Sequence, residues 1–82
     1  MASFKVEWKN SAEHDIRNID RQYISKILNV IETLSENPFP IQSKKLRDSE
    51  SSYRIRIGDY RVIYQIDTKE KIVTIYHIRH RK

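Results

Sequence analysis

The sequence predicts an α+β fold, with two helices packed on one face of a mainly antiparallel sheet. Two helix-like segments occupy the first half of the chain. Strand-like alternation of apolar and polar residues marks one short segment before them and three segments after them. The 82 residues contain neither an internal repeat nor a linker, and so short a chain leaves room for one core. We therefore expect residues 1–82 to form a single small domain.

The first strand and a short helix are expected near the beginning of the chain. Residues 4–8 alternate between apolar and charged side chains, which is typical of a half-buried strand. Asn10 or Ser11 is the expected N-cap of the helix, and Glu13, three residues after Asn10, completes a capping box. The apolar stripe of this helix consists of Ala12, Ile16 and Ile19.

A longer helix and a polar loop follow. Asp20 is the expected N-cap, apolar residues recur at helical spacing over residues 23–34, and Pro38 ends the helix. The two helices then form a hairpin with one apolar face. Residues 38–52 are rich in proline and polar residues, which predicts a loop. This loop carries three basic side chains, Lys44, Lys45 and Arg47.

The second half of the chain is expected to form a three-stranded antiparallel meander of residues 53–57, 60–66 and 72–78. A two-residue turn at Gly58-Asp59 puts Arg56 opposite Arg61. Arg54 then lies opposite Ile63. Because side chains alternate between the two faces of a sheet, the three arginines share the face that points away from the helices.

Positive charge is concentrated in the same half of the chain. Residues 1–43 contain five basic and six acidic side chains, whereas residues 44–82 contain eleven and five, a net charge of +6. Like charges directly opposite one another destabilise a sheet, so the Arg56–Arg61 pair indicates a bound anion. Arginine suits phosphate because its planar guanidinium stays charged and binds two oxygens at once. The alternative is that these side chains extend into solvent or pair with nearby carboxylates, Asp48, Glu50 and Asp59.

The composition excludes several kinds of chemistry. The chain has no cysteine, which excludes disulfides and thiolate sites and is typical of a reducing compartment, so we expect a cytoplasmic protein. No apolar run approaches the roughly 20 residues of a membrane span, and no membrane partner is expected. One glycine excludes a glycine-rich phosphate loop. His77 and His80 match no metal motif, so we expect neither a metal nor a cofactor.

Two segments carry a resemblance to a known family. The run YRIRIGDYRVIY at residues 53–64 and the run IYHIRHR at residues 75–81 resemble the RelE/ParE superfamily of toxins from type II toxin–antitoxin modules. The likeness extends to the order of elements and to the loop segment Lys45-Leu46-Arg47. The RelE-like branch implies an mRNA endonuclease that enters the ribosomal A site and inhibits translation. Such enzymes cut by attack of the RNA 2′-hydroxyl and require no metal.

The resemblance also implies which residues form the site. Its basic strand positions and its late arginine correspond here to Arg54, Arg56, Arg61 and Arg81. Many members carry a tyrosine a few residues after the late arginine, and this sequence has none there. Arginine is a poor general base, so proton transfer is expected from His80 or His77, with Tyr76 or ribosomal RNA as alternatives. Contacts to RNA and ribosome are expected from Lys44, Lys45, Arg47, Arg79 and Lys82.

The expected partners follow from the same resemblance. They are a cognate antitoxin, the ribosome with its mRNA, and operator DNA only indirectly through the antitoxin, because no helix here resembles a DNA-reading helix. Two other functions stay open. One is a ParE-like DNA gyrase inhibitor without catalysis of its own. The other is a non-catalytic module that binds RNA or the ribosome, or a toxin that has lost its activity.

Overall fold

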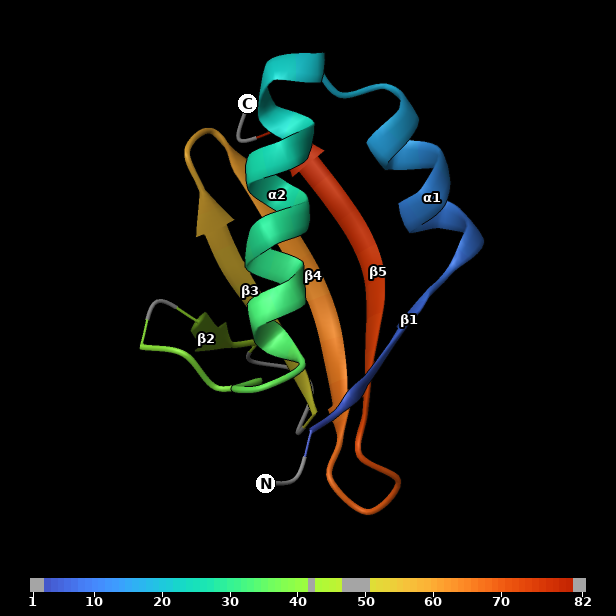
Figure 1. Cartoon of the computed structure of the whole chain (residues 1–82), viewed down its shortest axis with the longest axis vertical. Coiled ribbons are helices and arrows are strands. Elements are labelled where there is room, and N and C mark those ends of the chain that lie inside the picture. The colour runs from blue at the N-terminus through green and yellow to red at the C-terminus, as the bar shows by residue number, and fades with distance from the viewer. Residues whose placement is uncertain (1–2, 42, 47–50, 81–82) are drawn as a thin grey trace.

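The computed structural model describes residues 3–41, 43–46 and 51–80. Five strands and two helices follow one another along the chain (Figure 1): β1 (Lys5–Trp8), α1 (Asn10–Arg17), α2 (Arg21–Leu34), β2 (Ser43–Lys45), β3 (Ser52–Ile57), β4 (Tyr60–Asp67) and β5 (Ile72–His80). The strands form one sheet in the order β1-β5-β4-β3-β2, in which β1 runs parallel to β5 and all other neighbours are antiparallel. The predicted α+β class is confirmed. No helix in the described part of the chain is long and apolar enough to span a membrane.

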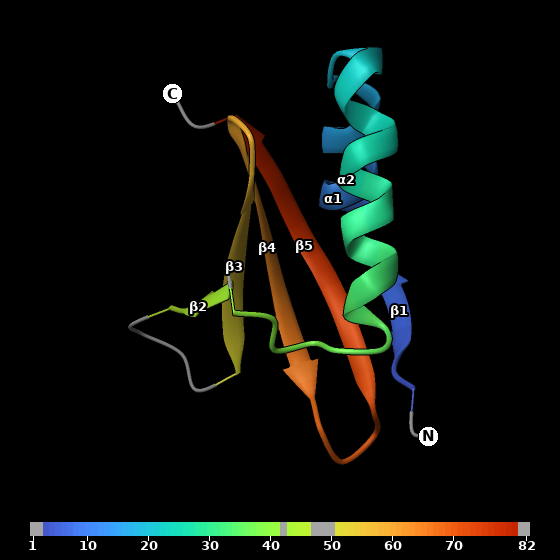
Figure 2. The ribbon, with the colours of Figure 1, turned by 60° about the vertical axis from the view of Figure 1, so that its left-hand side comes forward.

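Both helices lie on the same side of the sheet (Figure 2). The core between the helices and the sheet is formed by buried apolar side chains from α1, α2, β3, β4 and β5, and partly buried apolar residues, those of β1 included, pack against it. Tyr64 of β4 lies within this core, with 0% of its surface exposed. Its hydroxyl donates a hydrogen bond to the backbone oxygen of Pro38, 3.2 Å away, and so ties the segment after α2 to the sheet. Burial removes the phenol from water and raises the pKa of Tyr64.

The expected cap of the first helix is wrong, whereas that of the second is confirmed. Helix α1 begins after Lys9, which makes no side-chain capping bond, and Asn10 lies within the helix. The Ser11 hydroxyl is instead committed to a contact with β5, described below. The carboxylate of Asp20 accepts a hydrogen bond from the backbone nitrogen of Gln22 at 3.4 Å, as an N-cap should.

The predicted meander is confirmed and is extended at both sides. Strand β1 adds to β5, and the short strand β2 pairs with β3 where a loop was expected over residues 38–52. That loop prediction is wrong for residues 43–45 and for Ser52, which is the first residue of β3. The backbone nitrogen of Ser43 donates to the oxygen of Pro40 at 2.9 Å, which sets the direction of the chain into β2. Strand β2 is a short edge strand without a buried face, so no period-two pattern revealed it.

The turn between β3 and β4 has the predicted register. Ile57 pairs with Tyr60, and the two residues between them form the turn. Gly58 has φ +59°, while Asp59 is not among the residues of positive φ. A positive φ at only the first central residue is the pattern of a type II′ turn, whose twist matches that of the flanking strands. This turn fixes which side chains of β3 and β4 share a face.

Candidate functional site

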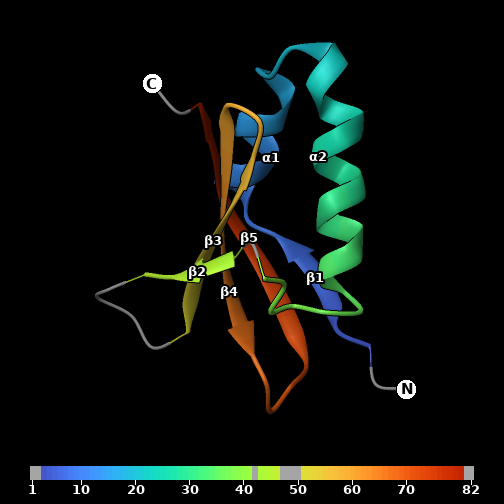
Figure 3. The same ribbon diagram turned by 90° about the vertical axis from the view of Figure 1, so that its left-hand side faces the viewer.

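Figure 3 shows that α1 and α2 leave one face of the sheet uncovered. The strand register places two rows of basic side chains on that face. In the first row, Arg61 of β4 pairs with Arg56 of β3 on one side and with Arg79 of β5 on the other. In the second row, Arg54 of β3 pairs with Lys44 of β2. We call these five residues the basic face. The predicted sharing of one face by Arg54, Arg56 and Arg61 is confirmed by this register.

The basic face is hollowed where the two rows meet. A depression of about 230 Å³ is lined by Lys44, Arg54, Arg56 and Arg61. Strand alternation puts these four residues on the face opposite α1 and α2, and Figure 2 shows that both helices lie on the other side of the sheet. Four cationic side chains around one hollow form a site of the kind that a phosphate group occupies.

These cations lack partners within the described part of the protein. None of the ion pairs and side-chain hydrogen bonds among described residues involves the guanidinium of Arg54, Arg56 or Arg61. The Nε atom of Arg61 is buried and, among the described residues, has no hydrogen-bond partner. Buried polar atoms are normally hydrogen-bonded, and one left unpaired costs about 1–3 kcal/mol. Of the carboxylates expected as alternative partners, Asp59 makes no such contact, and Asp48 and Glu50 lie outside the described residues.

Helix α1 covers the edge of β5 beyond the end of β1 (Figure 1). Strand β1 pairs with β5 only as far as Ile75. The Ser11 hydroxyl then donates to the backbone oxygen of Tyr76 at 2.7 Å, and the backbone nitrogen of Ile78 donates to Asp15 Oδ2 at 3.0 Å. Two side chains of one helix, four residues apart, thus replace the missing neighbouring strand.

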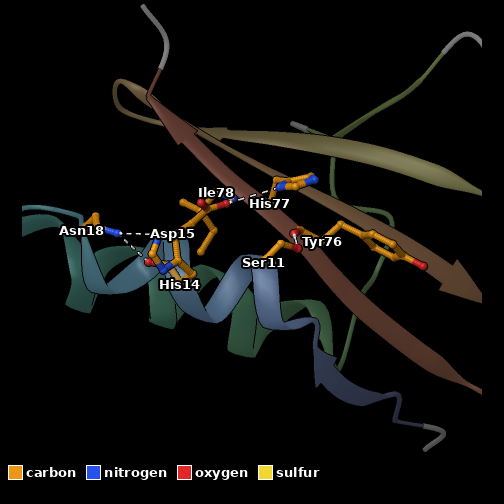
Figure 4. A network of polar contacts seen from close by, with 7 residues as sticks. All are labelled: Ser11, His14, Asp15, Asn18, Tyr76, His77 and Ile78. Carbon is orange, nitrogen blue, oxygen red and sulfur yellow. Dashed lines mark hydrogen bonds and ion pairs between the residues drawn. The ribbon is translucent and has the colours of Figure 1, made fainter.

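The imidazole of His77 lies beside this anchor. Its Nδ1 atom is 3.5 Å from Oδ2 of Asp15 (Figure 4). A register shift between Ile63 and Tyr64 places His77 opposite Ile63 and leaves Tyr76 as the extra residue on β5. His77 and Arg79 are two residues apart on one strand and therefore share a face. The structure thus brings His77 next to the basic face.

His80 occupies the other side of the sheet. It pairs with Tyr60, and the two rings meet edge to face with their centroids 5.0 Å apart. Tyr60 in turn packs against Tyr23 of α2, with ring centroids 5.4 Å apart. The structure therefore does not bring His80 to the arginines, because strand alternation turns it toward the helices.

The other expected site residues fall into two groups. Lys45 is exposed and pairs with Tyr53, so alternation turns it away from the basic face. Arg47, Arg81 and Lys82 lie outside the described residues. The Nζ atom of Lys9 lies 5.5 Å from the centre of the Tyr76 ring.

The sequence did not single out Asp15 as a site residue. Its only signal was its position four residues after Ser11 on an amphipathic helix.

The described residues contain no group of three or more histidines and carboxylates close enough to hold a metal ion. The candidate site is built from cationic side chains and the imidazole of His77. Such a set is suited to binding a phosphodiester and to stabilising added negative charge on it, and the imidazole has a nitrogen that can accept a proton.

Comparison with known proteins shows which family this chain belongs to. The family model described as the ParE toxin of the type II toxin–antitoxin system parDE matches residues 6–82. The chain belongs to this toxin family. RelE1 of Methanocaldococcus jannaschii is 33% identical to the toxin over an alignment 82 residues long. The match covers 96% of this chain and 91% of the relative.

Two solved complexes extend the likeness to the fold. The RelBE2 toxin–antitoxin complex of Mycobacterium tuberculosis contains a chain with a TM-score of 0.84 and 26% identity, covering 96% of this toxin and 99% of that chain. The RelE–RelB complex of Pyrococcus horikoshii contains one with a TM-score of 0.86 and 25% identity, covering 96% of both. The resemblance to the RelE/ParE superfamily is confirmed.

Proposed function

We propose that this toxin is a ribosome-dependent mRNA endonuclease that cuts the codon in the A site and so inhibits translation in the cytoplasm. The observation that carries the proposal is the row Arg56–Arg61–Arg79. At its centre lies the buried Nε of Arg61, which has no hydrogen-bond partner among the described residues. A fold that aligns three cations without neutralising them is suited to an anion with several oxygens, as in an RNA backbone.

The proposed reaction is an internal transfer within the RNA. The 2′-hydroxyl loses its proton, its oxygen bonds to the adjacent phosphorus, and the bond from phosphorus to the 5′ oxygen breaks. The products are a 2′,3′-cyclic phosphate and a 5′-hydroxyl. Negative charge builds up on the phosphoryl oxygens in the transition state, and Arg54, Arg56 and Arg61 stabilise it. Arg81 stays a predicted member of this set.

His77 is the group to which we assign proton transfer. An arginine side chain holds its proton too tightly to act as a general base. His77 lies diagonally across from Arg61, a separation of about 7–8 Å between neighbouring strands, whereas His80 packs on Tyr60. His77 takes the proton of the 2′-hydroxyl, and the 5′ oxygen leaves with a proton from solvent. The proton held on His77 then returns to solvent, so the enzyme is unchanged at the end of the cycle.

The proposed partners are the programmed ribosome and a cognate antitoxin. Both similar complexes pair a toxin with an antitoxin. An antitoxin segment with acidic side chains complements the basic face and competes with RNA for it. Operator DNA is reached only through the antitoxin in this proposal. Exposed Lys44 and Arg79 are the described residues that we assign to ribosome or RNA contact.

Primer extension on a defined mRNA in a translating extract tests the proposal. We expect discrete cuts within codons that require ribosomes and disappear with Arg61→Ala. Lys26→Ala is the matched control, because Lys26 is an exposed cation on α2, across the sheet from the basic face. Cuts that persist with Arg61→Ala, or that appear without ribosomes, would contradict the proposal.

A second function is favoured by the family model itself, which is that of ParE toxins. A ParE-like gyrase inhibitor would bind its target without cutting RNA. Toxicity in cells without any ribosome-dependent cut, together with loss of gyrase supercoiling in a purified assay, would establish that alternative. Ribosome binding with neither activity would instead indicate a non-catalytic module.

A further inference from the structure

One carboxylate oxygen joins helix α1 to both the backbone and a side chain of β5. Oδ2 of Asp15 accepts the backbone N–H of Ile78 at 3.0 Å and lies 3.5 Å from Nδ1 of His77 (Figure 4). We infer that Asp15 is the positioning residue of the nuclease site, which holds the His77 ring in the orientation and tautomer required for proton transfer. This inference rests on the function proposed above.

The tautomer follows from the contact. A neutral imidazole carries one N–H, and the other nitrogen is an acceptor. A carboxylate beside Nδ1 keeps the proton on that atom, which leaves the lone pair on Nε2. The Nε2 end of the ring points away from α1 (Figure 4), so the basic nitrogen of His77 is the one directed away from Asp15.

The position of the carboxylate is itself fixed. The N–H of Ile78 donates to the carboxylate oxygen, and Ile78 directly follows His77 in β5. Adjacent residues of one strand therefore position both the carboxylate and the imidazole. Ser11 holds α1 to the strand one helical turn earlier, by its 2.7 Å bond to Tyr76. The Asp15 side chain is 29% exposed and that of His77 is 36% exposed, so both are restrained while the ring stays open to a substrate.

Anchoring the strand edge does not by itself require a charge. An amide oxygen would accept the N–H of Ile78 equally well, and the neutral hydroxyl of Ser11 performs the neighbouring anchor. The only ion-pair contact of Asp15 within the described chain is with His77. The charge therefore acts on the imidazole, and substitutions that keep the anchor but remove the charge separate the two roles.

The test is a double-mutant cycle on single-turnover cleavage of mRNA on programmed ribosomes, with Asp15→Asn and His77→Gln made singly and together. We expect Asp15→Asn to slow cleavage at saturating ribosomes at least about 10-fold, part of the roughly 10²–10⁴-fold that proton transfer contributes, without weakening ribosome binding. In the His77→Gln background we expect Asp15→Asn to have no further effect. Glu13→Gln, which removes the charge of an exposed carboxylate on the same helix, should cut within about twofold of the wild-type rate.

The NMR chemical shifts of the two ring nitrogens of His77 report its tautomer independently of any measurement of activity. We expect the proton on Nδ1 in the wild type and on Nε2 to a substantial extent in Asp15→Asn. An equal loss of rate from Asp15→Asn in both backgrounds, or no change in rate or tautomer, would overturn the inference while leaving the nuclease intact. A wild-type protein that cuts nothing would overturn the proposed function and the catalytic role of Asp15 together, and the tautomer would still report whether Asp15 orients the ring.

Discussion

Arg56 and Arg61 lie directly opposite one another across the hairpin of β3 and β4, and no carboxylate among the described residues separates or neutralises them. The turn at Gly58 fixes this register, so the chain cannot relieve the repulsion by sliding one strand past the other without turning core residues out of the core. The arrangement therefore costs stability in the free protein. We expect an anion bound between the two guanidinium groups to offset this cost.

Arg56→Gln should stabilise the free protein. A like-charged pair on a sheet costs about 0.2–1 kcal/mol, and glutamine removes the charge while keeping most of the side-chain length. The expected rise in Tm is about 1–8 °C for a domain of this size and is larger at low ionic strength. Thermal denaturation followed by circular dichroism measures it. Lys26→Gln, on exposed α2 surface, should change stability by less than about 0.5 kcal/mol, and a lower Tm for Arg56→Gln would contradict the repulsion.

The same substitution should make RNA binding less sensitive to salt. Each phosphate contact to a single strand releases counterions and contributes about −0.7 to the slope of log K against log salt concentration. We expect Arg56→Gln to make the slope less negative by about that amount, and Lys26→Gln to leave it unchanged. Fluorescence anisotropy of a labelled single-stranded RNA between about 50 and 200 mM salt gives both slopes. Equal slopes for Arg56→Gln and wild type would show that Arg56 does not contact phosphate.

The hairpin and its basic face could be predicted from the sequence because their determinants are local. One glycine in a two-residue turn sets the register, and strict alternation then assigns each side chain to a face. The same reasoning failed for His80, whose face depends on the irregularity of β5 at Tyr76 and on the pairing of β5 with β4. A bulge of one residue reverses every later side chain of a strand, and nothing local in the sequence marked it.

Long-range contacts explain the other failures. Ser11 looked like a helix cap by its neighbours in sequence, but it bonds to Tyr76, 65 residues away. Asp15 is an unremarkable polar residue of a short amphipathic helix until β5 is placed beside it. Strand β2 exists because Pro40 and β3 supply its partners, and its own residues show little strand preference. Contacts of this kind depend on the assembled fold.

Gly58→Ala should destabilise the hairpin modestly and without steric clash. A side chain at this position meets no atom within 4 Å, so the cost is that of a left-handed backbone at φ +59°, about 1–2 kcal/mol. Gly58→Asn should cost less, because asparagine tolerates this conformation. Chemical denaturation of both variants measures the difference. Equal stability of alanine and asparagine at position 58 would show that the backbone conformation does not limit the turn.

Tyr64→Phe should make the protein less stable at neutral pH and less sensitive to alkali. Burial raises the pKa of Tyr64 above its value of about 10 in the unfolded chain, so the folded state holds this proton longer than the unfolded state does. The corresponding stability is fully present below about pH 10 and is lost as pH rises through the folded-state pKa. Phenylalanine removes this pH dependence.

The cost of Tyr64→Phe at neutral pH comes from the lost bond to Pro38. The buried oxygen of Pro38 loses its donor at 3.2 Å, which corresponds to about 0.5–1.5 kcal/mol. Urea denaturation between about pH 7 and pH 11, a range that brackets the ordinary tyrosine value, should show the variant less stable than wild type at the low end and closer to it at the high end. Tyr23→Phe is the control, because the Tyr23 hydroxyl makes no hydrogen bond to any described residue and Tyr23 is not among the groups that shift the pKa of Tyr64. Parallel curves for Tyr64→Phe and wild type would mean that the buried phenol does not couple ionisation to folding.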